Sequence, residues 1–576
     1  MELARLVEAL SRPEAYPHPV SDVVVHHTHI SVVFLAGPYA YKIKKPLDLG
    51  FLDFTTLEKR RLFCLEEVRL NARLAPGVYL GVVPVVACDG EVRIGSEGPP
   101  RGAAPPAPET SPQSGRDRVL RGSEGSPRGA APPTSKSPLT IEDYAVWMER
   151  LPDEATLEFR LARDDVDERL ISGLAERIAA FHAGAERGEH IAACGGWEVV
   201  SGNCRENFEQ SAPQIGTTLS AAVYARIRDL TGRALERLRP SIERRAEAGV
   251  PCDTHGDLRL DHVYVFPDRP PPRDLVVVDC IEFNERFRYA DPVADMAFLA
   301  MDLAFQGRRD FAVRFAEAYF SASSDAEGRE LLSFYTAYRA AVRGKVEGFE
   351  ALSREVPHHE REDALRTSRA HWLLALVELE EPGRRPCLVL VAGLPGTGKS
   401  TLARGLAAAA GFEVVTSDAV RKELAGFTPT ERAAAEFGEG LYTTEWNERT
   451  YAECLRRVTQ LLFEGRRVIV DASFREEARR REFLDTARAW GVPGLLLLCT
   501  VDPEVVRDRL RKRKGDVSDA DWEIYRRAAA RWEEPAPITG KESVEIPTGH
   551  AEEAALQAAL KALQQRSLVA APDPRR

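Results

Sequence analysis

The stretch CLVLVAGLPGTGKSTLARGLAAAAG, residues 387–411, decides the fold of the C-terminal part of the chain. It begins with an unbroken apolar run, continues through a glycine-rich segment and ends in a run rich in alanine and leucine. This order predicts a buried strand, a loop and a helix. The loop, Gly393-Leu-Pro-Gly-Thr-Gly398-Lys399-Ser400, matches GxxxxGK[ST], in which backbone N–H groups and a helix N-terminus surround phosphate oxygens. The stretch therefore predicts a phosphate-binding loop, with a chance glycine-rich turn as the alternative.

The residue types of this loop fit the phosphates of ATP. Lys399 is expected to reach the β- and γ-phosphates, and the Ser400 hydroxyl to ligate Mg²⁺. Asp471 ends the apolar run VIV and is expected to hold the same Mg²⁺ through water, with a turn residue at a strand end as its alternative. The sequence therefore predicts an ATP and Mg²⁺ site whose cofactor-binding residues are Gly393, Leu394, Pro395, Gly396, Thr397, Gly398, Lys399, Ser400 and Thr401.

Further strand-like runs follow the loop, with helical patterns between them. They are EVVTSD at 413–418, RRVIVDAS at 466–473 and GLLLLCTV at 494–501. Such alternation is typical of a parallel α/β sheet. We therefore expect a P-loop NTPase domain over residues 386–570, built on a doubly wound parallel sheet. No NKxD motif follows the loop, which disfavours a guanine-nucleotide-binding protein.

Asp418 and Arg421 follow the second strand-like run, in TSDAVRKEL. This D-x-x-R arrangement resembles P-loop kinases of the polynucleotide-kinase, zeta-toxin and gluconate-kinase kind, and the resemblance covers about residues 386–535. It implies that Asp418 orients or deprotonates an acceptor hydroxyl and that Arg421 binds substrate or phosphate. A helix N-cap Asp followed by an exposed Arg is the alternative.

The basic run VVRDRLRKRKGDVSDA, residues 505–520, resembles the lid of these kinases. Arg509 and Arg513 lie four residues apart, so a helix would place both on one face. The resemblance implies that the two guanidinium groups clamp the transferring phosphoryl group. A basic face exposed to solvent is the alternative.

A second motif lies upstream, where residues 255–262 read HGDLRLDH and the run VVVD ends at Asp279. A carboxylate in a short loop and another at a later strand end form the layout of protein-kinase-like phosphotransfer. The run resembles the HGDLxxxN motif of aminoglycoside phosphotransferases, which implies that Asp257 is a catalytic base and Asp279 a Mg²⁺ ligand. His262 stands where that family has a metal-binding Asn. Because imidazole is a poorer ligand for Mg²⁺ than an amide oxygen, His262 predicts weaker or altered metal binding.

The run YKIKK, residues 41–45, ends a strand at the place where such kinases keep their phosphate-binding lysine. Lys42 and Lys44 share one face of a strand, since side chains alternate with period two. Lys42 is preferred for the phosphate contact, with Lys44 as the alternative. Glu67, on the helix that follows, is the expected ion-pair partner, with Glu66 as the alternative.

A low-complexity insert, residues 95–138, divides the N-terminal region. It contains ten Pro, seven Gly and seven Ser, and GSEGPPRGAAPP at 95–106 returns as GSEGSPRGAAPP at 122–133. This composition predicts disorder. The flanking runs read as strands, with residues 23–45 as two strands joined at Gly37, so the insert is expected to interrupt a small sheet. We expect a protein-kinase-like bilobal domain over 1–380, with an N-lobe at about 1–150 and a C-lobe at about 151–380.

Composition narrows the functions open to this chain of 576 residues. Its formal net charge of −11 argues against a general nucleic-acid-coating role. The nine cysteines are scattered without a CxxC pair, which disfavours a zinc ribbon or a disulfide scaffold. No apolar run approaches the ~20 residues of a membrane span, and acids and prolines stand where a signal peptide has its apolar run. We therefore expect a cytoplasmic protein without a membrane partner.

Together these patterns predict two kinase-like units in one chain, of mixed α/β and α+β class. The expected activity is ATP- and Mg²⁺-dependent phosphoryl transfer to a hydroxyl of a small molecule, by Asp418 at one site and Asp257 at the other. Two alternatives stay open. One is a polynucleotide kinase acting on a 5′-hydroxyl, and the other is a regulatory ATPase whose N-terminal domain binds ATP without transfer. The oligomeric state is left open.

Overall fold

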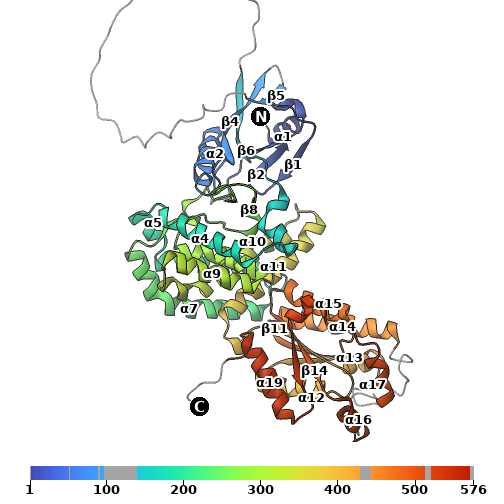
Figure 1. The fold of residues 1–576 in the computed structure, drawn as a ribbon. Helices are drawn as coiled ribbons and strands as arrows, with labels where there is room; N and C mark the ends of the chain where they lie inside the picture. The colour runs from blue at the N-terminus through green and yellow to red at the C-terminus, as the bar shows by residue number, and fades with distance from the viewer. Residues whose placement is uncertain are drawn as a thin grey trace, which may run out of the picture. The chain divides into compact units, whose positions relative to one another are not determined.

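The computed structural model describes residues 2–50, 52–88, 91–95, 139–428, 443–512 and 521–570 (Figure 1). Residues 96–138 of the predicted insert therefore lie outside the described part. Among the described residues, no helix is both long and apolar enough to cross a membrane. The chain forms two compact units. Unit 1 comprises Met1–Asp165, His255–Asp257 and Asp261–Arg288, and unit 2 comprises Val166–Thr254, Leu258–Leu260 and Tyr289–Arg576.

Unit 1 contains a six-stranded antiparallel sheet of order β1-β2-β3-β6-β4-β5. The prediction of two strands over residues 23–45 is wrong, because the run forms three. The Thr28 hydroxyl accepts a hydrogen bond from the Ser31 backbone at 2.9 Å, which turns the chain between the first two strands. The strands are β1 (Val23–His27), β2 (Ser31–Ala36), β3 (Tyr39–Lys44), β4 (Tyr79–Cys88), β5 (Glu91–Ile94) and β6 (Thr140–Glu149).

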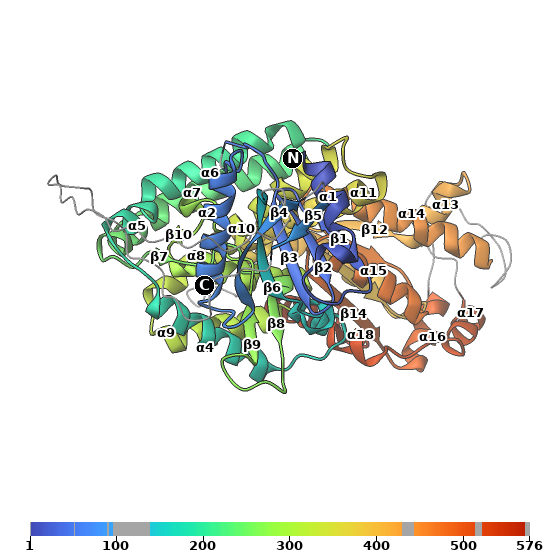
Figure 2. The same ribbon diagram turned by 90° about the horizontal axis from the view of Figure 1, so that it is seen from above.

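Two helices cover opposite faces of this sheet (Figure 2). Side chains alternate along each strand, so odd and even residues face different helices. Val83 and Ala145 pack with α1 (Leu3–Leu10), whereas Val82 and Val146 pack with Cys64 of α2 (Leu57–Asn71). Unit 1 also holds α3 (Leu157–Ala162) and a hairpin of β8 (Val263–Val265) and β9 (Leu275–Val277). As predicted, β5 and β6, on either side of the insert, belong to one sheet.

The N-terminal part of unit 2 is helical, apart from the short pair β7 (Cys252–Asp253) and β10 (Tyr289–Ala290). Asp291 caps α8 by accepting from the Val293 backbone at 2.9 Å and pairs with Arg245. The helices are α4 (Glu168–Gly184), α5 (Glu189–Cys194), α6 (Trp197–Ser211), α7 (Ala221–Glu247), α8 (Pro292–Phe305), α9 (Arg309–Ser323), α10 (Leu332–Leu352) and α11 (His358–Leu379).

The rest of unit 2 contains a parallel sheet of order β12-β13-β11-β14-β15. Its strands are β11 (Cys387–Ala392), β12 (Glu413–Thr416), β13 (Arg467–Asp471), β14 (Gly494–Thr500) and β15 (Ser543–Pro547). One face packs on α12 (Lys399–Ala410) and α19 (Glu552–Gln565), and the other on α14 (Thr444–Phe463) and α15 (Glu477–Ala489) (Figure 1). Helices on both faces agree with the predicted doubly wound sheet, while β15 was not expected.

Helix α11 joins the two parts of unit 2 through one apolar core. Eight consecutive residues, Ala370–Val377, are all buried. Trp372 and Leu376 belong to the same cluster as Val223 of α7 and Leu388 of β11. A Cβ atom on Gly491, after α15, would lie 2.3 Å from the carbonyl oxygen of Ala370. The sheet and the helices before it are therefore packed as a single body within unit 2.

Candidate functional site

The predicted phosphate-binding loop connects β11 to α12, and its glycines adopt backbone conformations that other residues rarely adopt. Gly396 and Gly398 have φ angles of 80° and 93°, a left-handed conformation that larger residues rarely adopt. A Cβ atom on Gly396 would also lie 2.9 Å from Cγ1 of Val506. Any other residue would strain the curled backbone that surrounds a phosphate group in such loops.

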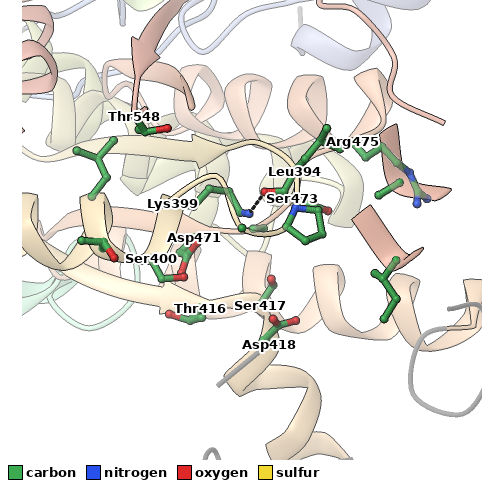
Figure 3. Close-up of a pocket in the computed structure, with 18 of the residues that line it drawn as sticks. Leu394, Lys399, Ser400, Thr416, Ser417, Asp418, Asp471, Ser473, Arg475 and Thr548 are labelled. Atoms are coloured by element: carbon green, nitrogen blue, oxygen red, sulfur yellow. Dashed lines mark hydrogen bonds between the residues drawn. The ribbon is translucent and has the colours of Figure 1, made fainter. Parts of the chain in front are cut away.

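Lys399, Ser400 and Asp471 meet where α12 begins (Figure 3). The Nζ atom of Lys399 donates to the carbonyl of Leu394 at 2.9 Å. Asp471 is buried at the end of β13, beside the Ser400 hydroxyl. Burial raises the pKa of Asp471, and the opposing effects of Lys399 and Ser400 are smaller. Because Mg²⁺ takes hydroxyl and carboxylate oxygens as ligands, Ser400 and Asp471 fit this ion.

Asp418 and Arg421 lie on α13 (Ser417–Leu424), which follows β12. Nη1 of Arg421 donates to Oδ1 of Asp418 at 2.6 Å, and its Nη2 donates to Oδ1 of Asn447 at 3.0 Å. Arg421 is buried, so the alternative of an exposed arginine is wrong. The guanidinium group holds one oxygen of the carboxylate in a fixed position, and Asn447 is a partner that the sequence pattern did not indicate.

Arg509 lies on α16 (Pro503–Lys512), near the end of the phosphate-binding loop. Its Nη2 donates to the carbonyl of Thr548 at 2.6 Å, and the Thr548 hydroxyl donates to the carbonyl of Thr397 at 2.6 Å. Thr548 therefore connects Arg509 to the loop, although no sequence signal pointed to it. Arg513, its predicted companion, lies outside the described residues.

These side chains line one cavity of about 1340 Å³. Gly393 and Thr397 do not line it, and the buried Thr397 hydroxyl donates to the carbonyl of Leu394 at 2.8 Å. Sequence reasoning missed Arg475 and Arg479, which follow β13. Because ligands bind at the carboxyl ends of parallel strands, their position four and eight residues after Asp471 was the available signal. Predicted residues on the cavity wall are Leu394, Pro395, Gly396, Gly398, Lys399, Ser400, Thr401, Asp418, Arg421, Asp471 and Arg509.

Unit 1 brings together the second set of predicted residues around Glu67. Nζ of Lys42 lies 2.9 Å from Oε1 of Glu67 and 2.6 Å from Oδ1 of Asp279. Nζ of Lys44 lies 2.8 Å from Oε2 of Glu67 and also contacts Glu282, which the sequence pattern did not indicate. Glu66, the alternative partner, instead forms an ion pair with Arg69. The geometry therefore favours Glu67 over Glu66.

The two lysines differ in their surroundings. Lys44 is fully buried between Glu67 and Glu282, whereas Lys42 is 12% exposed and contacts the half-exposed Asp279. Burial would lower the pKa of Lys42, but Asp279, Glu67 and Glu282 outweigh it and raise the pKa well above its usual value. Both lysines are therefore charged, and Lys42 is the one that lies at the exposed edge of this cluster.

Asp279 is held in an unusual backbone conformation beside Lys42. Its φ angle is 63°, which is rare for a residue other than glycine. The Asp279 backbone N–H donates to the hydroxyl of Tyr79 at 3.2 Å. Burial raises the pKa of the Asp279 carboxyl, but Lys42 and His262 outweigh this and lower it below the usual value. Asp279 is therefore a carboxylate, and strain of this kind is often found at functional sites.

Asp257 and His262 lie next to this cluster. Nδ1 of His262 donates to the carbonyl of Asp257 at 2.9 Å, and its Nε2 lies 3.8 Å from Oδ2 of Asp279. His255 accepts from the Asp257 backbone at 3.3 Å and donates to the carbonyl of Val278 at 3.0 Å, so it braces the loop. Across the described ranges, no group of three His, Cys, Asp or Glu side chains is arranged to hold a metal ion. Metal binding by His262 and Asp279 stays a prediction.

Comparison with known proteins shows similarity over both parts of the chain. A family model described as an AAA domain matches residues 388–535, which confirms the predicted P-loop domain. Uncharacterized protein Rv2004c of Mycobacterium tuberculosis (strain ATCC 25618 / H37Rv) is 32% identical over 521 residues, 89% of this chain and 91% of that protein. Uncharacterized protein Mb2027c of Mycobacterium bovis (strain ATCC BAA-935 / AF2122/97) matches to the same extent.

Solved structures are similar over a smaller part of the chain. A sugar kinase from Janibacter sp. HTCC2649 is 21% identical and covers 32% of this chain and 99% of its own, with a TM-score of 0.26. A gluconokinase from Sinorhizobium meliloti 1021 is 18% identical and covers 32% of this chain and 93% of its own, with a TM-score of 0.24.

Proposed function

This chain belongs to the family of the mycobacterial protein Rv2004c, and we propose that it is an ATP- and Mg²⁺-dependent kinase that phosphorylates a hydroxyl group of a small molecule. The transfer takes place at the P-loop cavity of unit 2. The match to an AAA domain supports nucleotide binding there. The hydroxyl acceptor and the phosphoryl transfer to it are what we propose.

One observation carries this proposal. A single cavity contains the loop lysine Lys399, the pair Ser400 and Asp471, and the separate carboxylate Asp418 on α13. Phosphoryl transfer needs a phosphate cradle and, opposite it, a group that accepts the proton of the attacking hydroxyl. A carboxylate fixed by an arginine is suited to orient the acceptor hydroxyl of a kinase.

Each side chain has a defined part in this reaction. Lys399 leaves the Leu394 carbonyl to bind phosphate oxygens, and Arg509 neutralises charge that develops on the transferring group. Arg421 occupies Oδ1 of Asp418, so Oδ2 is the oxygen that accepts the hydroxyl proton. Mg²⁺, held by Ser400 and through water by Asp471, would offset charge on the phosphates.

The geometry of unit 1 favours a second nucleotide site, in a protein-kinase-like domain. The observation that supports it is Lys42 between Glu67 and Asp279. In this proposal Lys42 binds phosphate oxygens, Asp279 with His262 holds a divalent cation, and Asp257 is the base. The Asp257→Asn variant distinguishes phosphoryl transfer at this site from ATP binding alone.

The test is mass spectrometry of a bacterial metabolite extract incubated with ATP, Mg²⁺ and the full-length protein. We expect a new phosphorylated product that Asp418→Asn abolishes. Asp257→Asn is compared in parallel, and Asp363→Asn, on the exposed face of α11, is the matched control. Loss of a product with Asp257→Asn assigns transfer to unit 1.

Two other results would support the alternative functions. Phosphate appearing only on added oligonucleotides, with strongly salt-dependent binding, indicates a polynucleotide kinase. ATP hydrolysis without any phosphorylated acceptor, in the extract or on oligonucleotides, contradicts the kinase proposal and supports a nucleotide-regulated ATPase.

A further inference from the structure

The charge of the P-loop cavity differs from that of the whole chain. The chain has a formal net charge of −11. Among the described residues, eight Lys and Arg side chains and six Asp and Glu side chains line the cavity, a surplus of two positive charges. A cavity of opposite sign to its protein attracts anions and raises their local concentration.

The positive surplus lies on the side of the cavity that holds Asp418. The side formed by α12, α16, α19 and the end of β13 is balanced, with three basic and three acidic side chains. The other side is formed by α13, α14, the segment that begins α15, and α17 (Trp522–Ala529) with the residues after it. Its described residues include three acidic side chains and five arginines, which are Arg421, Arg475, Arg479, Arg527 and Arg531. The nucleotide phosphates therefore do not account for this surplus.

Arg479 is held rigidly at this wall. Its Nη1 atom donates to Glu482 at 2.8 Å, and its guanidinium lies 5.6 Å from the centre of the Tyr451 ring. Tyr451 is itself buried and accepts a hydrogen bond from the Phe474 backbone at 3.2 Å. A guanidinium has five N–H donors, so one carboxylate and one ring leave donors that can bind an anion in the cavity.

Arg475 is positioned by its backbone. The carbonyl of Arg475 accepts from Nη2 of the fully buried Arg480 at 3.0 Å and from the Glu533 backbone at 3.1 Å. Its own Nη2 donates to Glu476 at 2.8 Å. In Figure 3, Thr548 and Arg475 lie on opposite sides of Lys399. Arg475 therefore belongs to the wall away from the Thr548 end of the loop.

We propose that the hydroxyl acceptor of the P-loop site carries an anionic group, a carboxylate or a phosphate, which Arg475 and Arg479 bind while Asp418 orients the hydroxyl. This inference rests on the proposed kinase function and adds the substrate class. Arginine suits this task because its planar guanidinium donates two parallel hydrogen bonds to a carboxylate or phosphate.

The test compares matched acceptors on the full-length protein: glucose, gluconate and glucose 6-phosphate, and glycerol, glycerate and glycerol 3-phosphate. We expect kcat/KM to be higher for the anionic members of each set, and comparison of the carboxylates with the phosphates identifies the anion. Arg475→Gln and Arg479→Gln should each raise KM for the preferred anion by about tenfold to a hundredfold, the loss of a charged hydrogen bond. The Kd for ATP should be unchanged.

Calorimetric binding of the same compounds in the presence of ADP separates this inference from the kinase proposal. Arg456→Gln, on the exposed face of α14 and paired with Glu453, is the matched control. Anion binding that the two variants weaken, without turnover, supports the anion site and contradicts the kinase. Turnover of the neutral compounds alone, unaffected by either variant, leaves the kinase standing and overturns the anion site. If the protein shows no turnover and no anion binding, both proposals are overturned.

Discussion

Lys42 and Lys44 share one face of β3, yet their contacts give them different roles. Lys44 is enclosed by two buried carboxylates, so it neutralises charge inside unit 1. Lys42 touches the half-exposed Asp279, where a ligand can reach it. Two lysines on the same face of one strand are thus distinguished only by the residues that pack against them.

Replacing Lys44 should destabilise unit 1 more than replacing Lys42. Lys44→Met leaves Glu67 with Lys42 alone and removes the ion-pair partner of Glu282, and breaking a buried ion pair costs about 3 to 5 kcal/mol. Lys42→Met should cost less, since Lys44 still pairs with Glu67. Urea unfolding measures the difference, with Lys59→Met on the exposed pair to Asp53 as control. Equal losses for Lys44→Met and Lys59→Met would contradict this role.

Lys399 is expected to carry much of the nucleotide affinity of unit 2. Lys399→Ala removes the cation of the phosphate-binding loop and should weaken ATP binding by about tenfold to a hundredfold, the loss of one charged hydrogen bond. A fluorescent ATP analogue titrated into the protein measures the Kd. Lys561→Ala, on the exposed face of α19, should leave the Kd unchanged, and a similar fall in both variants would argue against a specific contact.

At the scale of single residues, sequence reasoning identified groups that belong to motifs. Lys399, Ser400, Asp418 and Asp471 stand at fixed distances from strand ends and were assigned to one site from that spacing. Glu282 and Asn447 were missed because their partners, Lys44 and Arg421, lie 238 and 26 residues away in the chain. Pairs of this kind are created by the fold and leave no local pattern.

Helices α10 and α11 form an antiparallel pair joined by a buried contact. Nδ1 of His371 lies 2.7 Å from Oε2 of Glu347, and Arg343 lies 2.9 Å from the other oxygen of the same carboxylate. Burial would raise the pKa of Glu347, but His371 and Arg343 outweigh it and lower the pKa below its usual 4.5. A carboxyl with a lowered pKa stabilises the folded state above the pKa of the unfolded chain.

This contact predicts a pH-dependent difference in stability. Glu347→Gln should cost about 1 to 3 kcal/mol at neutral pH, the loss of a charged buried hydrogen bond. The gap to the wild type should close as the pH falls below about 4.5, because protonation removes the same charge from the wild type. Thermal unfolding between pH 7 and about 3.5 tests this, with exposed Glu362→Gln as control. A gap that widens on acidification would contradict it.

The insert between β5 and β6 can be shortened without loss of the fold, according to the positions of its two ends. Ile94 pairs with Val85 and Thr140 with Ala87, so both ends of the insert lie beside β4. With strands ~4.8 Å apart, a linker of about eight residues can join them. Replacing 96–138 by such a linker should preserve folding. It should raise the free energy of unfolding by about 1 to 2 kcal/mol, because a shorter loop costs less entropy to close. Aggregation or a lowered Tm would show that the insert contributes to the fold.

Among the elements, long periodic runs were predicted well and short ones poorly. The strand β11 is apolar throughout, and β13 and β14 contain the apolar runs VIV and LLLLC, so each was expected. The strand β15, SVEIP, has a single fully buried side chain, Ile546, so its sequence carries almost no pattern. Residues 23–45 were read as two strands because the turn near Thr28 contains neither Gly nor Pro.

For the whole chain, the shared core of unit 2 predicts cooperative unfolding. Trp372 and Leu376 of α11 pack in one cluster with β11 and β13, so neither side keeps its apolar surface covered alone. Calorimetry should show the helices of residues 166–380 and the parallel sheet melting in one transition. ATP should raise that transition, since ligands stabilise the state that binds them.

Separating the two parts checks this expectation. A fragment starting at residue 386 should aggregate or melt well below the full chain, because it exposes the surface that α11 covers. A fragment starting at residue 357, which keeps α11, should recover part of that loss. Equal Tm values for the full chain and the fragment from residue 386 would show that the shared core adds nothing to stability.

The contact of Gly491 with the carbonyl of Ala370 also limits how this protein can be rearranged. A side chain at residue 491 would meet the α11 backbone at 2.3 Å, so the loop after α15 is shaped around that helix. A designer who wishes to transplant the P-loop part onto another chain, or to exchange it for a relative's, would have to carry α11 along and keep the glycine. A joint at the start of β11 separates the sheet from α11, whereas a joint before α11 separates α11 from α10 and has to provide a new cover for that face.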